Sequence, residues 1–183
     1  AKDVRPAFLK TGAERMSFRH FDQIFNPASV AVVGASEREG SVGAHVLKNV
    51  VDYGYEGPVY PVNPKWKTVF GLRSYPSLGS IGDQCDLVIM AVPIQEVPAV
   101  LKDCARVNCA GAVILSAGGK EIGSKGQDVE ADIQKEAKRT GIRIIGPNCL
   151  GILSSKSRLN ATFSRQTPLT GKLAFLSQSG AIF

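Results

Sequence analysis

The chain has 183 residues, an apolar content of 44% and a mean hydropathy of +0.01, values typical of a globular protein with a packed core. Its net charge of +6 comes from scattered Lys and Arg residues without interleaved aromatic side chains, so we expect no nucleic acid partner. No apolar run approaches the roughly 20 residues of a membrane span, and the charged N-terminal stretch lacks the apolar segment of a secretion signal. We therefore expect a cytoplasmic protein with no membrane partner.

Short apolar runs alternate with helical segments along most of the chain. Residues 1–20 show no sustained period and are predicted to form a tail or connector, and a short helical lead-in follows at residues 21–27. Strands are predicted at 29–34, 58–62, 86–92, 110–115 and 142–145, and helices at 42–53, 95–107 and 126–140. This rhythm predicts an α/β fold over residues 21–150, a Rossmann-like, doubly wound parallel sheet with helices on both faces.

Residues 151–183 contain one further strand candidate, at 172–176, followed by a turn rich in Ser and Gly. A segment of this length cannot bury a hydrophobic core of its own. We therefore expect it to be the truncated start of a second α/β domain. An unpaired strand there would leave an open sheet edge, which permits a homodimer.

The most informative motif lies between the first strand and the first helix and reads GASEREGSVG, residues 34–43. Gly34, Gly40 and Gly43 allow a sharp turn, Ser36 and Ser41 offer hydroxyl groups, and the free N–H groups at a helix start attract negative charge. The motif predicts a phosphate-binding turn. The alternative is a set of glycines needed only for the turn and for packing.

The end of the second strand indicates which phosphorylated ligand the turn holds. A dinucleotide-binding domain usually carries Asp or Glu there to bind the ribose, whereas this chain has Asn63, Pro64 and Lys65. The missing acid disfavours NAD, and the Asn and Lys favour a phosphate group. An ordinary surface turn is the alternative interpretation of these three residues.

Five motifs in order carry a resemblance to a known family: GASEREGSVG, GPVYPVNPKW, the strand end at Ala91-Val92-Pro93, GPNCLG, and FLSQSGA. Over residues 21–183 the chain resembles the CoA-binding domain of NDP-forming acyl-CoA synthetases, a family that includes the α subunit of succinyl-CoA synthetase. The resemblance implies that CoA or acyl-CoA is the ligand. It implies CoA contacts from Gly34, Ser36, Gly40, Ser41, Val42, Gly43, Asn63, Lys65, Val92, Pro93, Ser116 and Ala117, with Asn148 and Cys149 near the thiol end.

The resemblance also implies what lies elsewhere in the enzyme. Ser177, Ser179 and Gly180 become a helix start that steadies a phosphoryl group, with a plain loop as the alternative. The catalytic phosphohistidine is expected beyond the chain end, and neither His20 nor His45 is a candidate for it. ADP, ATP and Mg²⁺ would act only in the full-length enzyme, whose remaining ligase and ATP-grasp domains would be the partners of this chain.

The loop after the fourth strand departs from the pattern of the family. Members of the family often carry an aromatic residue in the loop after the fourth strand, in a Gly-Phe-x-Glu pattern, whereas this chain reads Ala-Gly-Gly-Lys-Glu at residues 117–121. The loop keeps its glutamate and lacks the ring.

A regulatory protein is the alternative function. Some proteins fuse a synthetase-like region that senses acyl-CoA to a GNAT protein lysine acetyltransferase domain.

The cysteines complete the set of reactive side chains. Cys85, Cys104, Cys109 and Cys149 show no C-x-x-C spacing and have no histidine nearby. Three of them lie next to or within apolar segments. We expect buried free thiols and no metal site.

Overall fold

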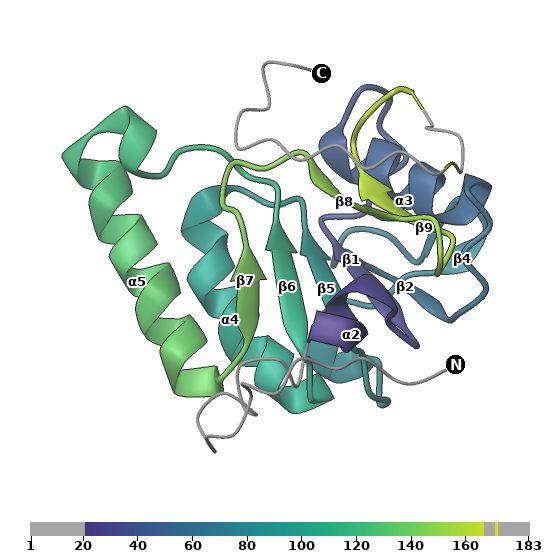
Figure 1. The fold of residues 1–183 in the computed structure, drawn as a ribbon, viewed down its shortest axis with the longest axis horizontal. Coiled ribbons are helices and arrows are strands. Elements are labelled where there is room, and N and C mark those ends of the chain that lie inside the picture. The colour runs from purple at the N-terminus through teal and green to yellow at the C-terminus, as the bar shows by residue number, and fades with distance from the viewer. Residues whose placement is uncertain (1–20, 167–170, 172–183) are drawn as a thin grey trace, which may run out of the picture.

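The structure is a computed structural model that describes residues 21–166 and residue 171. Its centre is a sheet of five parallel strands in the order β2-β1-β5-β6-β7 (Figure 1). The strands are β1 (Val30–Val33), β2 (Val59–Val62), β5 (Leu87–Met90), β6 (Gly111–Ile114) and β7 (Arg143–Ile145). Counted along the chain this is the order 2-1-3-4-5 of doubly wound sheets, in which the direction of strand addition reverses between β1 and β5.

Helices cover both faces of the sheet, as the sequence predicted. The helices are α2 (Phe21–Phe25), α3 (Val42–Asp52), α4 (Val97–Cys104) and α5 (Ser124–Thr140). Val30 and Val32 of β1 belong to the hydrophobic cluster that includes α3, whereas Ala31 and Val33 belong to the cluster that includes α4. All four residues of β1 are buried, because a parallel strand covered on both faces has no solvent side.

The predicted strands and helices are confirmed to within a few residues. The helix expected at 95–107 is α4 with short 3-10 helices at both ends, η2 (Ile94–Glu96) and η3 (Ala105–Val107). Another short 3-10 helix, η4 (Lys120–Ile122), precedes α5, which ends at Gly141 in the left-handed conformation (φ 72°). No helix among the described residues is long and apolar enough to cross a membrane.

The crossover from β2 to β5 is the one connection within the sheet that contains no α-helix. It holds instead a small antiparallel hairpin, β3 (Thr68–Val69) and β4 (Leu72–Arg73), and a 3-10 helix, η1 (Leu78–Ser80). These elements are too small to cover the strand ends beside α4. The space left there is the site described below.

A second hairpin, β8 (Gly151–Ser154) and β9 (Leu159–Thr162), packs on α3 and was not predicted. Its Ile152, Leu159 and Ala161 lie in the same hydrophobic cluster as the buried side of α3. The Asn49 side chain of α3 donates to the carbonyl oxygens of Thr162 (2.7 Å) and Ser164 (2.9 Å). The domain boundary expected at residue 150 therefore cuts through one hydrophobic cluster, and the strand expected at 172–176 lies outside the described residues.

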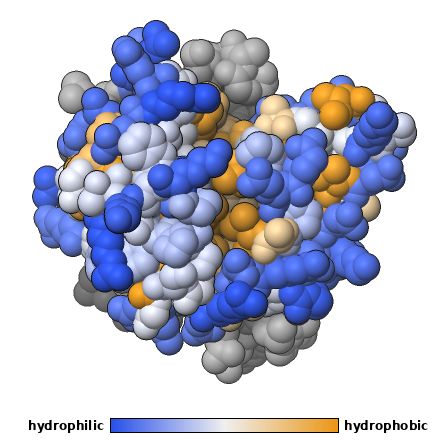
Figure 2. Space-filling view, turned by 180° about the vertical axis from the view of Figure 1, so that it is seen from behind, coloured by the Kyte–Doolittle hydropathy of each residue, from blue (hydrophilic) through white to orange (hydrophobic). Residues whose placement is uncertain are grey.

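The surface opposite the view of Figure 1 is mostly polar, and apolar side chains gather in a hollow near its centre (Figure 2).

Candidate functional site

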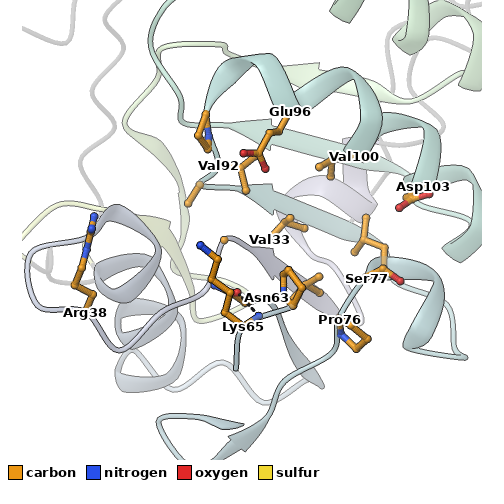
Figure 3. Close-up of a pocket in the computed structure, with 16 residues that line it drawn as sticks. Val33, Arg38, Asn63, Lys65, Pro76, Ser77, Val92, Glu96, Val100 and Asp103 are labelled. Carbon is orange, nitrogen blue, oxygen red and sulfur yellow. Dashed lines mark hydrogen bonds between the residues drawn. The ribbon is translucent and has the colours of Figure 1, made fainter. Parts of the chain in front are cut away.

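A pocket of about 480 Å³ opens at the carboxyl ends of β1, β2 and β5 (Figure 3). Val33 and Val62 end their strands in it, α4 forms one wall, and the segment around η1 forms the other. The pocket lies where strand order reverses, which is the usual ligand position in open α/β sheets. Among the predicted site residues it contains Gly34, Asn63, Lys65, Val92 and Pro93.

Glycine is required at two positions of the predicted turn. Gly34 has φ +87°, and a Cβ atom there would lie 2.5 Å from the carbonyl oxygen of Ala91, at the end of β5. A Cβ atom at Gly43 would overlap the carbonyl oxygen of Gly34, because the first turn of α3 packs directly against the end of β1. The two glycines therefore bring the start of α3 to the edge of the pocket.

The hydroxyl groups of this turn are partly used within the turn itself. Ser41 caps α3: its Oγ accepts from the backbone N–H of Ala44 (3.3 Å) and donates to the carbonyl oxygen of Arg38 (2.8 Å). Ser36 Oγ accepts from the backbone N–H of Arg38 (2.9 Å), and its hydroxyl hydrogen has no acceptor among the described residues. The N–H groups of Val42 and Gly43 have no acceptor within the helix, since they lie in its first turn.

Asn63 joins the end of β2 to the glycine turn. Its Nδ2 donates to the carbonyl oxygen of Ala35 (2.7 Å), and its Oδ1 accepts from the backbone N–H of Lys65 (2.9 Å). The residue predicted as a phosphate contact thus has both ends of its amide engaged. Its role in this structure is to fix the two loops on which any ligand contact depends.

The charges of the pocket are arranged from one end to the other (Figure 3). Arg38 and Lys65 are exposed at one end, and neither forms an ion pair with any residue that the structure describes. Glu96 and Asp103 come from the α4 wall, and Asp103 lies at the end opposite Arg38. An anionic group at the first end would meet two cations that have no ion-pair partner among the described residues, with the Glu96 carboxylate on the facing wall.

Arg38, Glu96 and Asp103 were not predicted as site residues. Arg38 is the one basic residue of the turn motif, and that signal was present in the sequence. Glu96 and Asp103 carried no comparable signal, because their place in the pocket depends on the missing helix of the β2–β5 crossover.

The other end of the carboxyl edge, after β6 and β7, has a different construction. Ser116 donates its hydroxyl proton to the carbonyl oxygen of Val92, and its own carbonyl oxygen accepts from the backbone N–H of Asn148 (2.9 Å). These bonds join the ends of β5, β6 and β7. The predicted residues Ser116, Ala117 and Asn148 therefore lie on one continuous edge, and Asn148 also lines a second pocket of about 600 Å³ against α5.

The Cys149 thiol lies against the carboxyl ends of β6 and β7 and is engaged there by backbone carbonyl groups. Its Sγ donates to the carbonyl oxygen of Ile114 (3.3 Å) and packs beside the α3 cluster. Burial raises the pKa of the thiol, so it stays protonated near neutral pH. Any ligand contact at Cys149 would involve its backbone. Burial also raises the pKa of Cys85, and all four cysteines are free thiols.

The loop after β6, which lacks an aromatic residue, is held by two glutamates. Glu121 accepts from the backbone N–H of Gly118 (2.7 Å), and this bond lowers the pKa of the Glu121 carboxyl group. Glu130 of α5 accepts from the backbone N–H of Lys120 (2.8 Å).

The two histidines, which the sequence analysis excluded as the phosphohistidine, and the phosphate-binding candidates of the last motif are not part of the described site. His45 lies on α3, half-buried, and does not line the pocket. His20, Ser177, Ser179 and Gly180 lie outside the described residues.

Comparisons with known proteins agree on one family. A family model described as a CoA binding domain matches residues 28–155. The chain is 44% identical over 160 residues to the ADP-forming acetate–CoA ligase I of Archaeoglobus fulgidus, covering 87% of this chain and 23% of the ligase. It is 40% identical over 165 residues to the α subunit of the ADP-forming acetate–CoA ligase I of Pyrococcus furiosus, covering 88% of this chain and 36% of that subunit.

A solved structure supports the same relationship. The dinucleotide-forming acetyl-coenzyme A synthetase 1 of Ca. Korarchaeum cryptofilum, in complex with phosphate and ADP, superposes with a TM-score of 0.83 at 38% sequence identity. The similarity covers 88% of this chain and 34% of that chain. In each comparison the present chain spans only about a quarter to a third of its relative.

Proposed function

Because the chain belongs to the CoA-binding domain family, we propose that it binds coenzyme A at the carboxyl edge of its sheet as part of an NDP-forming acyl-CoA synthetase. The observation that carries the proposal is the pocket at the strand reversal, where two unpaired cations lie beside an apolar floor. CoA offers the matching chemistry, since its phosphorylated adenosine combines a planar base with several negative charges.

The proposed contacts divide along the edge. The phosphates bind at the N–H groups of Val42 and Gly43 and at Lys65, which supplies a positive charge without a competing ion pair among the described residues. The uncharged pantetheine arm runs across the ends of β5 and β6, past Val92, Pro93, Ser116 and Ala117. The thiol end lies near Asn148 and the backbone of Cys149.

The proposed parent reaction converts acyl-CoA, ADP and phosphate to a free acid, CoA and ATP through an acyl phosphate and a phosphohistidine. The described residues would supply the CoA site, while the phosphohistidine, the nucleotide and Mg²⁺ belong to other parts of the enzyme. Those parts, the ligase and ATP-grasp regions, are the proposed partners. The cytoplasmic location, the homodimer and the GNAT-fused alternative stay predictions.

Isothermal titration of the purified chain with CoA, and separately with NAD, tests the proposal. We expect saturable binding of CoA with one site per chain and no measurable heat with NAD, because the end of β2 offers no carboxylate to a ribose diol. Binding of NAD without binding of CoA would contradict the proposal.

A further inference from the structure

The two ends of the pocket carry side chains of opposite charge, and the two ends of the proposed ligand also differ chemically. Arg38 and Lys65 lie at one end, and the Asp103 carboxylate lies at the other (Figure 3). Between them Val33, Val62 and Leu78 form an apolar floor, and the polar Asn63 and Ser77 also line the pocket. A ligand with phosphates at one end and a hydrogen-bond donor at the other would match this arrangement in only one orientation.

The phosphorylated adenosine of CoA is such a ligand. Its phosphates match the cationic end, and the two faces of the base match the apolar lining. Adenine carries its hydrogen-bond donor, the 6-amino group, on the edge remote from the sugar. With the phosphates beside Lys65, the amino edge of the base enters the end of the pocket that Asp103 lines.

The Asp103 carboxylate can accept a hydrogen bond at this end of the pocket. Its side chain is 32% exposed, and Oδ1 is 3.1 Å from Nη1 of Arg106, one turn further along the chain. The structure gives Oδ2 no partner among the described residues. The ion pair with Arg106 fixes the orientation of the carboxylate while one oxygen stays available for a ligand.

Glu96, the other acid of the α4 wall, differs in position. It precedes α4 and is exposed, and it lies seven positions before Asp103 in the chain, about 10 Å along the helix axis. Its carboxylate lies nearer to Lys65 and Val92 than to the far end of the pocket (Figure 3). The two acids therefore cannot serve the same group of one bound base.

We propose that Asp103 is a specificity-determining residue that accepts a hydrogen bond from the 6-amino group of the CoA adenine. The inference rests on the proposed function and extends it from the ligand to the recognition of its base. A carboxylate can only accept hydrogen bonds, so it favours a base that presents a donor and disfavours one that presents an acceptor.

The test compares CoA with 1,N6-etheno-CoA, in which the amino group becomes a ring nitrogen that can only accept. We expect the wild-type chain to bind etheno-CoA about tenfold more weakly than CoA, the effect of one hydrogen bond to a charged group. Asp103→Asn keeps the size of the side chain and adds a donor. We expect it to bind the two ligands within about threefold of each other, since an amide can donate to the etheno base and accept from adenine.

Glu96→Gln is the matched control, because it makes the same change on the same wall and should leave the ratio of the two affinities unchanged. Equal binding of both ligands by the wild-type chain would overturn the inference and leave the proposed function intact. An unchanged ratio in Asp103→Asn would also overturn it, because a steric penalty from the larger base does not depend on the carboxylate. Failure of CoA itself to bind would contradict the proposed function.

Discussion

The two halves of the carboxyl edge differ in how their charged side chains are used. After β1 and β2, Arg38 and Lys65 face the pocket without ion-pair partners among the described residues. After β6 and β7, the hydroxyl of Ser116 and the carboxylates of Glu121 and Glu130 are bonded to neighbouring backbone groups. The first half is open to a charged ligand, and the second is fixed in shape before any ligand arrives. A ligand with a charged end and a long neutral arm matches both halves.

The glycine turn connects the first half to the sheet, and its disruption should have the largest effect. Gly43→Ala places a methyl group on the carbonyl oxygen of Gly34. We expect a loss of about 2–3 kcal/mol in the free energy of unfolding, typical of overpacking, together with loss of CoA binding. This outcome has the opposite sign from the usual stabilising effect of Gly→Ala in a helix.

Urea unfolding and CoA titration measure both effects. Gly40→Ala is the control, because a Cβ atom there meets no atom within 4 Å. Its cost should be about 1 kcal/mol, from the positive φ angle alone. Equal stability of Gly43→Ala and the wild-type chain would show that the turn does not pack as described.

Removal of a cation from the open half should weaken binding without a change in stability. We expect Lys65→Ala to lower CoA affinity by about 10- to 100-fold, since a hydrogen bond to a charged group is lost. The affinity of the wild-type chain should fall with rising salt, and that of the variant should fall less. Lys67→Ala, an exposed lysine in the same loop that does not line the pocket, is the control and should bind like the wild-type chain.

A substitution in the half after β6 and β7 should lower stability and leave CoA affinity nearly unchanged. Ser116→Ala removes the hydrogen bond to the carbonyl oxygen of Val92 and should cost about 1 kcal/mol of stability. Its CoA affinity should stay within about threefold of the wild-type value, well below the cost of a lost charged contact. Ser155→Ala, at an exposed position outside this network, is the control for thermal unfolding. A large loss of CoA affinity with unchanged stability would instead make the Ser116 hydroxyl a direct ligand contact.

The smallest expected effect is the pH dependence of the contribution that Glu121 makes to stability. The backbone N–H of Gly118 holds the pKa of Glu121 below its ordinary value of 4.5 in the folded chain. The contribution of Glu121 to stability is therefore complete above pH 4.5 and is lost as the pH falls through the lower folded pKa. The difference in melting temperature between the wild-type chain and Glu121→Gln should shrink as the pH falls through this range. A difference that grows toward acid pH would contradict this assignment.

Sequence patterns predicted the five-stranded sheet because its strands are apolar runs bounded by Gly and Pro. They did not predict the β3–β4 and β8–β9 hairpins, because β3 and β4 have only two residues each and neither β8 (GILS) nor β9 (LNAT) is a continuous apolar run. The turn glycines were recognisable because φ and close packing restrict those positions to glycine. Asp103 was not, because its place in the pocket depends on the crossover between β2 and β5, which contains no α-helix. The internal roles of Ser41 and Asn63 likewise depend on contacts with neighbouring loops.

The most direct test of the central claim is a crystal structure of the chain with CoA. We expect density for the adenosine in the pocket between η1 and α4, with the phosphates at the start of α3 and at Lys65. The pantetheine arm should cross the ends of β5 and β6 toward Asn148. An empty pocket beside Lys65, with CoA bound elsewhere on the chain, would contradict the account.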